Sequence, residues 1–439
     1  MSKLEIAIWS FPVLFVLILL RMPIGLAMFI LGVGGSVWVN GSWLQVVSQM
    51  KSMPYATFSN YSLSIIPLFL LMGQFATHGG LSRSIFAAAE SWLGHRKGGI
   101  AMASIGACAG FGAICGSSLA TAATMAQVAL PELRRYGYSG SLATGALAAG
   151  GTLGILIPPS LVLVIYALLT EQNIAKLFMA AIIPGILAAL GYMAAVAVYV
   201  RIKPDSAGRR EPAPMAERFK ALAKVWPVLI VFLAVVGGIY LGVFTPTEGA
   251  AVGAAGTGLI ALVNGGLNWQ RMIHSLQQTA ISSGMIFFIV LGAAVYNTFL
   301  AFAQLPQEAA AWVTEQGFSP LMVLTAILVL YLVLGCFMDS LSMILLTVPI
   351  FFPVVSELDF GLSPEDFALW FGILVLIVVE VGLITPPVGM NLFIINSMAE
   401  DTPMGETYRG AIPFITADII RVVILVAFPS LTLGLIWLF

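Results

Sequence analysis

The sequence predicts an all-α polytopic membrane protein, built as an inverted-topology repeat with two re-entrant helical hairpins and two broken transmembrane helices. Three observations lead to this prediction: the composition, the interruption of long apolar segments, and the similarity of the two halves. Hydrophobic residues make up 60% of the chain and charged residues 9%, whereas soluble domains carry about a quarter charged residues. The mean hydropathy is +1.01. Most of the chain therefore belongs in a bilayer.

Paired prolines interrupt two apolar segments at their centres. The first segment reads GGTLGILIPPS at residues 150–160, and the second reads EVGLITPPVGMN at residues 380–391. Proline removes a backbone donor and clashes with the preceding turn, and glycine disfavours helix. We therefore expect unwound backbone at residues 150–159 and 382–391, within broken helices at residues 139–170 and 366–397.

The apolar run from residue 99 to residue 131 is too long for one membrane span and too short for two. As a straight helix it would measure about 50 Å, against a hydrocarbon core of about 30 Å. Its middle carries Gly116, Ser117 and Ser118, and basic residues flank both of its ends. These features predict a re-entrant hairpin at residues 99–136 that opens to the cytoplasm.

The second half repeats this plan with opposite flanking charge. Residues 320–353 form another long apolar run, interrupted by MDSLS and followed by the acidic loop SELDFGLSPEDF. We expect a hairpin at residues 320–357 that opens to the outside, with a break at residues 338–342. Each half then crosses the membrane an odd number of times, which inverts the second half relative to the first.

A basic, proline-containing linker at residues 201–224 divides the chain and is expected in the cytoplasm. The first repeat is residues 1–224 and the second is residues 225–439. Amphipathic arm segments follow the third span of each repeat, at residues 81–99 and 307–317. The remaining spans are expected near residues 5–20, 24–40, 62–78, 174–200, 225–243, 249–265, 275–302 and 411–439.

The two halves also align without gaps at their interruptions. GSSLATAATMAQVALP matches MDSLSMILLTVPIFFP, which sets Ser117 against Asp339 and Ser118 against Ser340. GILIPPS matches GLITPPV, which pairs the two double prolines. Glycine and proline are common in membrane helices for packing alone, but this symmetric pairing favours a binding site.

Unwound backbone inside a bilayer must face protein or a cavity, because each unsatisfied peptide group costs several kcal/mol. Freed helix N-termini attract anions, and freed C-terminal carbonyls attract cations. The cation-binding candidates are Gly116, Ser117, Ser118, Gly151, Thr152, Gly154, Asp339, Ser340, Ser342, Gly382 and Thr385. The substrate-binding candidates are Ser118, Pro158, Pro159, Ser340, Pro386, Pro387, Gly389 and Asn391.

Asp339, Glu380 and Arg421 are charged residues within apolar segments. A carboxylate as deep as Asp339 costs roughly 2.5 to 3.5 kcal/mol to insert, and such a residue indicates function. Asp339 could ligate a cation or carry a proton. Glu380 is the next candidate, although it could simply bond to neighbouring helix backbone. Arg421 could reach the interface or a partner, and we leave it outside the expected site.

Several other classes of function are disfavoured. The sequence contains no G-x-x-x-x-G-K-[ST] motif, so it predicts no nucleotide hydrolysis, and a net charge of -1 gives no indication of nucleic-acid binding. Cys108, Cys115 and Cys336 lie in apolar segments without metal-ligand spacing, which predicts packed thiols. An intramembrane enzyme is a weak alternative, because neither Ser117 nor Ser118 has a base near it in sequence.

Three long stretches resemble the large membrane subunit of tripartite ATP-independent periplasmic (TRAP) transporters, the DctM-like family. They are GAICGSSLATAATMAQVALPELRRYGYSGSLATGALAAGGTLGILIPPS, CFMDSLSMILLTVPIFFPVV and GLITPPVGMNLFIIN. The resemblance implies a sodium-coupled elevator importer of organic acids, usually carboxylates or sialic acid, in the bacterial inner membrane. It implies sodium as coupling ion, no other cofactor, and no enzymatic activity.

The resemblance also implies two partners: a small four-helix membrane subunit, expected as a separate polypeptide, and a periplasmic substrate-binding protein. The hairpins and broken helices would move together against the remaining spans. Two alternatives stay open. Protons could drive transport through Asp339, or the chain could act as a stand-alone anion symporter without a binding protein.

Overall fold

A computed structural model describes residues 2–438 and contains helices without any strand in that range. Helices α10, α15 and α21 are long and apolar enough to cross a membrane by themselves. Three further bent pairs reach the same length together: α3 with η1 and α4, α8 with α9, and α11 with α12 and α13. The multi-helical architecture expected from the composition is therefore present.

The first half of the chain contains the following elements. They are α1 (Lys3–Leu19), α2 (Ile24–Asn40), α3 (Trp43–Phe58), η1 (Tyr61–Ser64), α4 (Ile65–His78), α5 (Leu81–Leu93), α6 (Gly99–Cys115), α7 (Ser118–Arg135), α8 (Gly140–Leu156), α9 (Leu161–Leu169), α10 (Ile174–Ile202), η2 (Pro204–Ser206) and α11 (Met215–Ala223).

The second half contains these elements. They are α12 (Trp226–Phe232), the π-helical turn η3 (Leu233–Gly237), α13 (Gly238–Tyr240), α14 (Pro246–Val263), α15 (Trp269–Phe302), α16 (Leu305–Glu315), α17 (Pro320–Gly335), α18 (Ser340–Val355), α19 (Pro364–Gly382), α20 (Met390–Met398), α21 (Met404–Ala427) and α22 (Ser430–Leu438).

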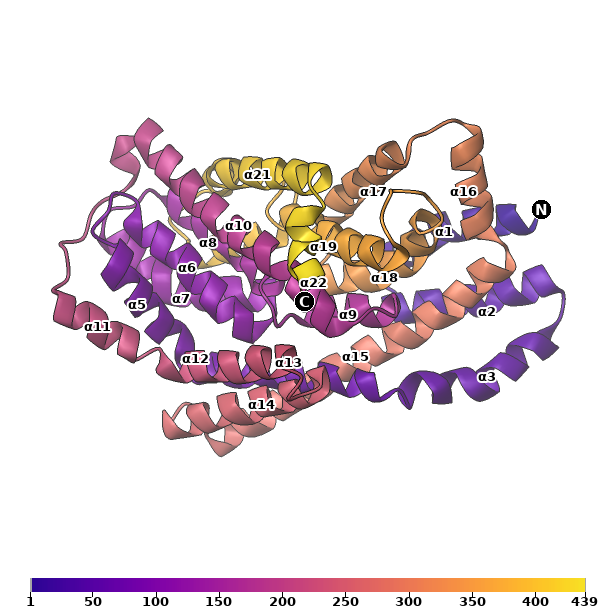
Figure 1. The fold of residues 1–439 in the computed structure, drawn as a ribbon, viewed down its shortest axis with the longest axis horizontal. Coiled ribbons are helices and arrows are strands. Elements are labelled where there is room, and N and C mark those ends of the chain that lie inside the picture. Colours follow the sequence, from indigo (N-terminus) through magenta and orange to yellow (C-terminus); the bar gives the residue numbers. More distant parts are fainter. Residues whose placement is uncertain (1, 439) are drawn as a thin grey trace.

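Helices α8 and α19 are buried along nearly their whole length, with α8 in the left half of the view and α19 near its middle (Figure 1). Every residue of α8 from Leu142 to Leu156 is buried, and so is every residue of α19 from Phe367 to Gly382. A helix that is apolar on all sides must be covered on all sides. Accordingly α6, α7 and α21 pack around α8, while α17, α10 and α21 pack around α19.

A second group of helices packs against these elements through α4, which contacts α6 and α9, and through α15, which contacts α18. The longest helix, α15, lies against α2 and α4, and α14 lies against α4. In Figure 1, α12, α13 and α14 lie along the lower edge of the view, below α8 and α10. The contact of α15 with α2 is close because small residues meet there: a Cβ on Gly292 would lie 2.3 Å from the carbonyl oxygen of Gly25.

One expected boundary is wrong, and two helices were not expected. The last span was expected at residues 411–439, but α21 begins at Met404 and the chain breaks at Phe428 and Pro429 before α22. The linker at residues 201–224 contains helix α11. Helix α3 was not expected, because the polar residues Gln45, Gln49 and Lys51 interrupt its apolar sequence.

The linker is attached to its surroundings at two places. The carbonyl of Ser206 accepts a hydrogen bond from the backbone N–H of Ser139, at the junction of α7 and α8 (2.9 Å). Arg210 donates its backbone N–H to the carbonyl of Gly94 (3.2 Å), and its guanidinium lies 3.1 Å from Glu90 Oε1 on α5. The linker therefore contacts both the base of the first hairpin and the arm helix α5.

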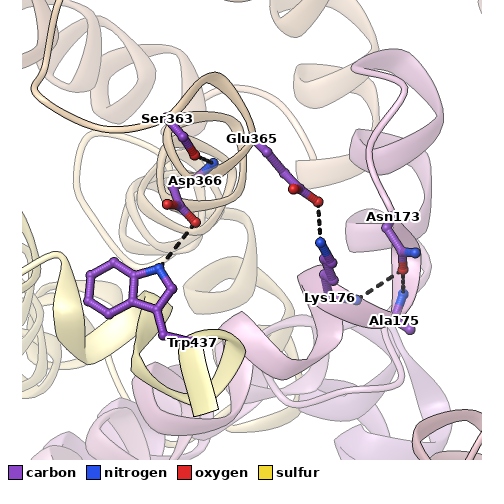
Figure 2. Close-up of polar contacts among 7 residues, drawn as sticks. All are labelled: Asn173, Ala175, Lys176, Ser363, Glu365, Asp366 and Trp437. Carbon is purple, nitrogen blue, oxygen red and sulfur yellow. Dashed lines mark hydrogen bonds and ion pairs between the residues drawn. The ribbon is translucent and has the colours of Figure 1, made fainter. Parts of the chain in front are cut away.

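The first turns of α10 and α19 lie side by side, and Figure 2 shows the polar contacts there. Asn173 and Ser363 cap the two helices by accepting backbone N–H groups. Lys176 Nζ lies 2.6 Å from Glu365 Oε1, with both side chains partly exposed. This ion pair joins one helix from each half of the chain.

Candidate functional site

The first hairpin turns at Gly116 and Ser117. Helix α6 ends with Gly116 at φ 65°, a left-handed conformation that glycine adopts without strain. Ser117 then caps α7 by accepting a hydrogen bond from the backbone N–H of Ala120 (3.4 Å). Because only these two residues separate α6 from α7, and the helices pack on each other, the expected hairpin tip is confirmed.

The second hairpin turns over Cys336–Asp339, a longer break of the same kind. Asp339 caps α18 by accepting a hydrogen bond from the backbone N–H of Ser342 (3.1 Å). Asp339 thus has the local role that Ser117 has in the first hairpin, as the alignment of the halves predicted. The helix resumes at Ser340, one turn earlier than expected, so Ser342 lies in helix.

Each hairpin tip lies against the break of the helix that follows it. In the second half, the backbone N–H of Gly389 donates to the carbonyl of Cys336 (3.1 Å). In the first half, a Cβ added to Gly116 would lie 3.5 Å from the backbone nitrogen of Leu161 and 3.8 Å from the carbonyl oxygen of Pro159. The first break is therefore buried against protein, as backbone without helical hydrogen bonds requires inside a bilayer, and Gly389 of the second break is held against its hairpin tip.

One carboxylate joins the two hairpin tips. Ser118 Oγ donates to Glu380 Oε2 and Ser340 Oγ donates to Glu380 Oε1, each at 2.5 Å. Glu380 lies on α19 just before its break and is 1% exposed. Residues from three elements far apart in the sequence thus meet at one side chain. Glu380 bonds to the tips rather than only to helix backbone, which resolves the alternative left open by the sequence.

A small cavity lies beside this junction. Its volume is about 160 Å³, and its lining includes Gly116, Ser117, Ser118, Asp339 and Ser340, together with Leu70 of α4 and Ser282 of α15. The tips of both hairpins therefore meet the second group of helices at this cavity. A second cavity of about 220 Å³ shares Gly116, Ser117, Leu70 and Ser282 and extends along α4 to Gln74 and Thr77.

The expected unwinding of residues 150–156 is wrong, because α8 remains helical to Leu156 and breaks only at residues 157–160. Gly151 and Gly154 allow close packing of α8 on the first hairpin. A Cβ on Gly151 would lie 2.6 Å from Ala122 Cβ, and one on Gly154 would lie 2.9 Å from the carbonyl oxygen of Ser117. Proline disfavours helical conformation in the residue before it and clashes with the preceding helical turn. The break therefore coincides with the two prolines and not with the glycines before them.

The second break covers residues 383–389, close to expectation. Gly389 has φ 66°, and the hydroxyl of Thr385 donates to the carbonyl of Val381 (2.6 Å). Asn391 is fully buried and donates its amide to the carbonyl of Ala148 on α8 (3.2 Å). Asn391 thus joins the second broken helix to the first.

The two proline pairs differ in exposure. Pro158 and Pro159 are buried, whereas Pro386 and Pro387 are exposed, and both pairs contain a cis peptide bond. The hydroxyl of Tyr408 donates to the carbonyl of Pro387 (2.6 Å). The second break is therefore the more open of the two.

A chain of buried polar side chains next to the first broken helix was not predicted from the sequence. The hydroxyl of Tyr192 donates to Asp418 Oδ2 (2.7 Å) and lies 2.9 Å from Thr152 Oγ1. Arg421 Nη2 lies 2.8 Å from Asp418 Oδ1, with the two side chains 7% and 1% exposed. Asp418 and Arg421 are three residues apart on α21, a spacing that places them on one helix face and could have indicated the pair.

The remaining expectations concern metal sites and cysteines. Within residues 2–438, no group of three or more His, Cys, Asp or Glu side chains is placed to hold a metal ion. Cys108, Cys115 and Cys336 are free and buried, as the apolar surroundings of these thiols predicted.

Comparison with known sequences identifies the class of protein. Residues 11–431 match the family described as Tripartite ATP-independent periplasmic transporter, DctM component. The chain therefore belongs to this family of multi-pass transporter permeases, in agreement with the resemblance found in the sequence.

Individual relatives are similar along most of their length. The C4-dicarboxylate TRAP transporter large permease protein DctM of Pseudomonas aeruginosa is 37% identical over 385 residues, covering 87% of each chain. The sialic acid TRAP transporter large permease protein SiaM of Vibrio cholerae is 31% identical over 419 residues, covering 95% of each chain.

A solved structure shares the fold. The crystal structure of the YdaH transporter of Alcanivorax borkumensis superposes with a TM-score of 0.67, covering 90% of this chain and 91% of that chain. The two sequences are 15% identical, so the similarity concerns the fold alone.

Proposed function

We propose that this chain is the large permease subunit of a sodium-coupled importer of organic acids. The observation that supports the proposal most directly is the junction at Glu380, where the tips of two hairpins share one buried carboxylate beside a cavity. Hydroxyl, carbonyl and carboxylate oxygens are the ligands that hard cations prefer. Ser118, Ser340 and Asp339 supply such oxygens at this place.

The proposed substrate is a carboxylate. The relatives in Pseudomonas aeruginosa and Vibrio cholerae are described as transporters of C4-dicarboxylates and of sialic acid, both of which are anions. The N-termini of α7 and α18 lie at the 160 Å³ cavity, and helix N-termini attract negative charge. A bound cation would offset the charge of Asp339 at the same cavity.

The proposed motion is an elevator. The hairpins α6–α7 and α17–α18 would move together with the broken helices α8–α9 and α19–α20 against α2, α4, α14 and α15. The two hairpins share Glu380, which supports their movement as one unit. The cavities between the tips and α4 and α15 lie where such a unit would slide.

The inverted repeat, the inner-membrane location and the two partners belong to the same proposal. The small membrane subunit and the periplasmic binding protein are proposed because the family as a whole is tripartite. The two halves carry matching tips and breaks, which supports their relation by inverted topology.

Reconstitution tests the proposal. The chain is placed in vesicles with its small membrane subunit and its binding protein, and uptake of a radiolabelled C4-dicarboxylate or sialic acid is measured with and without an inward sodium gradient. We expect uptake only with the gradient. Uptake that does not depend on sodium would refute the coupling, and uptake by this chain alone would favour the stand-alone symporter.

Proton coupling through Asp339 is tested in the same vesicles. Asp339→Asn removes the ionisable group but retains an oxygen that can cap α18. Uptake with unchanged rate and pH dependence would exclude a proton carried by Asp339. Loss of a pH-dependent component would instead support it.

A further inference from the structure

Helix α11 of the linker carries exposed apolar side chains on one face. Large apolar residues recur at alternating intervals of four and three residues from α11 through α12 to the start of η3, which is the spacing of one helix face. They are 45% to 63% exposed, and we call them the apolar stripe: Met215, Phe219, Leu222, Trp226, Leu229 and Leu233. The part of the stripe on α12 belongs to a candidate membrane span, so lipid covers it there. The part on α11 requires a separate explanation.

Helix α11 itself is too highly charged for the hydrocarbon core. Glu217, Arg218 and Lys220 lie within its nine residues, and Lys224 follows directly. Charged side chains are costly at the bilayer centre, and α11 also departs by 44° from the direction of α12 and α13. A helix with an apolar stripe on one face and charges on the other is typical of the boundary between membrane and water.

Packing on α5 fixes which face of α11 stays free. The ring of Phe219 meets the ring of Trp92 edge to face, with 5.8 Å between the centroids, and the guanidinium of Arg218 lies 6.0 Å from the same ring. Figure 1 shows α11 beside α5, leading into α12. Helix α11 cannot turn its stripe toward the protein without losing these contacts, so the stripe remains on the outside of the molecule.

The linker around α11 is basic. Residues 201–224 include seven Lys and Arg against three Asp and Glu. Arg210 is paired with Glu90, and Arg218 donates to the carbonyl of Ala213 (3.0 Å). In contrast, no ion pair among residues 2–438 involves Lys220 or Lys224. Both lysines are exposed, and their spacing of four residues places them on one helix face.

We propose that α11 is an interfacial anchor that binds anionic phospholipid in the cytoplasmic leaflet. The apolar stripe enters the boundary of the acyl chains, while the ammonium groups of Lys220 and Lys224 reach the lipid phosphates at the end of flexible aliphatic stems. Two cations beside an apolar stripe complement an anionic lipid, whereas a neutral lipid would leave both without a counter-charge. The anchor is separate from the proposed transport function and uses no residue of the hairpin tips.

Quenching by lipid tests whether the stripe lies in the membrane. In a chain whose three native cysteines are replaced by alanine, Leu222→Cys is labelled with an environment-sensitive fluorophore. The chain is reconstituted, alone and with its small membrane subunit, in vesicles of phosphatidylcholine and phosphatidylglycerol that contain a lipid with a spin-labelled acyl chain. The matched control is Glu217→Cys, which is exposed on the charged face of the same helix. We expect quenching at position 222 to be at least about threefold stronger than at position 217.

The choice of head group is tested with the label at position 222. Spin-labelled phosphatidylglycerol is compared with spin-labelled phosphatidylcholine in otherwise identical vesicles, and the anionic lipid should quench more strongly. Lys220→Gln combined with Lys224→Gln should lose this preference, because the attraction of the anionic head group comes from these cations. The control, Arg201→Gln combined with Lys203→Gln, removes two exposed cations of the same linker outside α11 and should keep the preference.

Several results would overturn the anchor. Equal quenching at positions 222 and 217 would show that the stripe does not face lipid. Equal quenching by the two lipids, or equal loss of preference in both double variants, would show that α11 does not select anionic lipid. Quenching that disappears when the small membrane subunit is bound would assign the stripe to that subunit instead. None of these measurements requires substrate or sodium, so they are independent of the uptake test.

Discussion

The two broken helices occupy corresponding places, but their equivalent side chains point to different partners. Counting back six residues from the first proline of each pair gives Thr152 in α8 and Glu380 in α19. Thr152 contacts Tyr192, and through it Asp418 and Arg421. Glu380 bonds to both hairpin tips instead.

The interruptions also differ between the two halves, both in length and in the exposure of their prolines. The first hairpin and the first broken helix are interrupted for two and four residues, and their prolines are buried. The second hairpin and the second broken helix have longer interruptions, and Pro386 and Pro387 are exposed. Similar sequences thus build a tightly packed first half and a more open second half, and the buried carboxylate lies in the open one.

Replacing Glu380 by the residue at the equivalent position should have the largest effect. Glu380→Thr removes the acceptor for Ser118 and Ser340, and a buried donor that is left without a partner costs roughly 1 to 3 kcal/mol. We expect sodium-driven uptake to fall at least about 100-fold, since 1.4 kcal/mol corresponds to a factor of ten. Uptake is measured in vesicles at matched protein amounts.

A matched variant controls for a simple loss of volume. Glu380→Gln keeps an acceptor oxygen for one serine and should retain more uptake than Glu380→Thr. Equal activity of the two variants and the wild type would show that the shared carboxylate does not matter for transport.

Breaking the polar chain behind the first broken helix should affect stability more than transport. Arg421→Met leaves Asp418 buried without its cation, and removing one partner of a buried ion pair typically costs about 3 to 5 kcal/mol. We expect a large drop in the unfolding temperature in detergent. The double variant Asp418→Asn with Arg421→Met should recover much of this loss, because no charge is then left unpaired.

Where the broken helices pack closely on the hairpins, an added methyl group should be equally destabilising in both halves. A Cβ on Gly112 would lie 2.5 Å from Gly154 Cα, and one on Gly382 would lie 2.6 Å from the backbone of Gly335. Gly112→Ala and Gly382→Ala should each cost about 1 to 3 kcal/mol by overpacking.

The control for these glycines is Gly191→Ala on α10, where an added Cβ would meet nothing within 4 Å. That substitution should be neutral or stabilise by up to about 1 kcal/mol, as alanine favours helix. If only one of Gly112→Ala and Gly382→Ala were destabilising, the two halves would differ in packing as well as in polar contacts.

The ion pair between Lys176 and Glu365 should contribute least, although it joins the two halves directly (Figure 2). Both side chains are partly exposed, and exposed pairs contribute roughly 0.2 to 1 kcal/mol and are screened by salt. Lys176→Met should lower the unfolding temperature slightly at low ionic strength and negligibly at high salt. A large loss that persists in salt would contradict this assignment.

Much of the architecture could be predicted because it follows from local rules. Paired prolines fix the breaks wherever they occur, and Gly116, Ser117 and Asp339 carry the turn and capping chemistry of the tips in their own sequence. The pairing of Ser118 with Ser340 in the alignment likewise anticipated their equivalent contacts. These features depend on a few adjacent residues.

The rest depends on contacts between distant segments. Gly151 and Gly154 have a low helix propensity, but close packing against the first hairpin keeps them helical, and tertiary packing commonly overrides propensity. The meeting of Tyr192 with Asp418 joins residues 226 positions apart, and no local pattern indicates it. The proposed cation and substrate roles of the candidate residues remain predictions.

The anchored linker limits how far the base of the first hairpin and the end of the arm helix α5 can separate. Ser206 is held by Ser139 at the base of the hairpin, and Arg210 is held by Gly94 on the arm. Four residue steps separate these anchors, and a fully extended chain covers at most about 3.6 Å per step. The two anchors can therefore separate to about 14 Å, and any larger separation must first break one of these two hydrogen bonds.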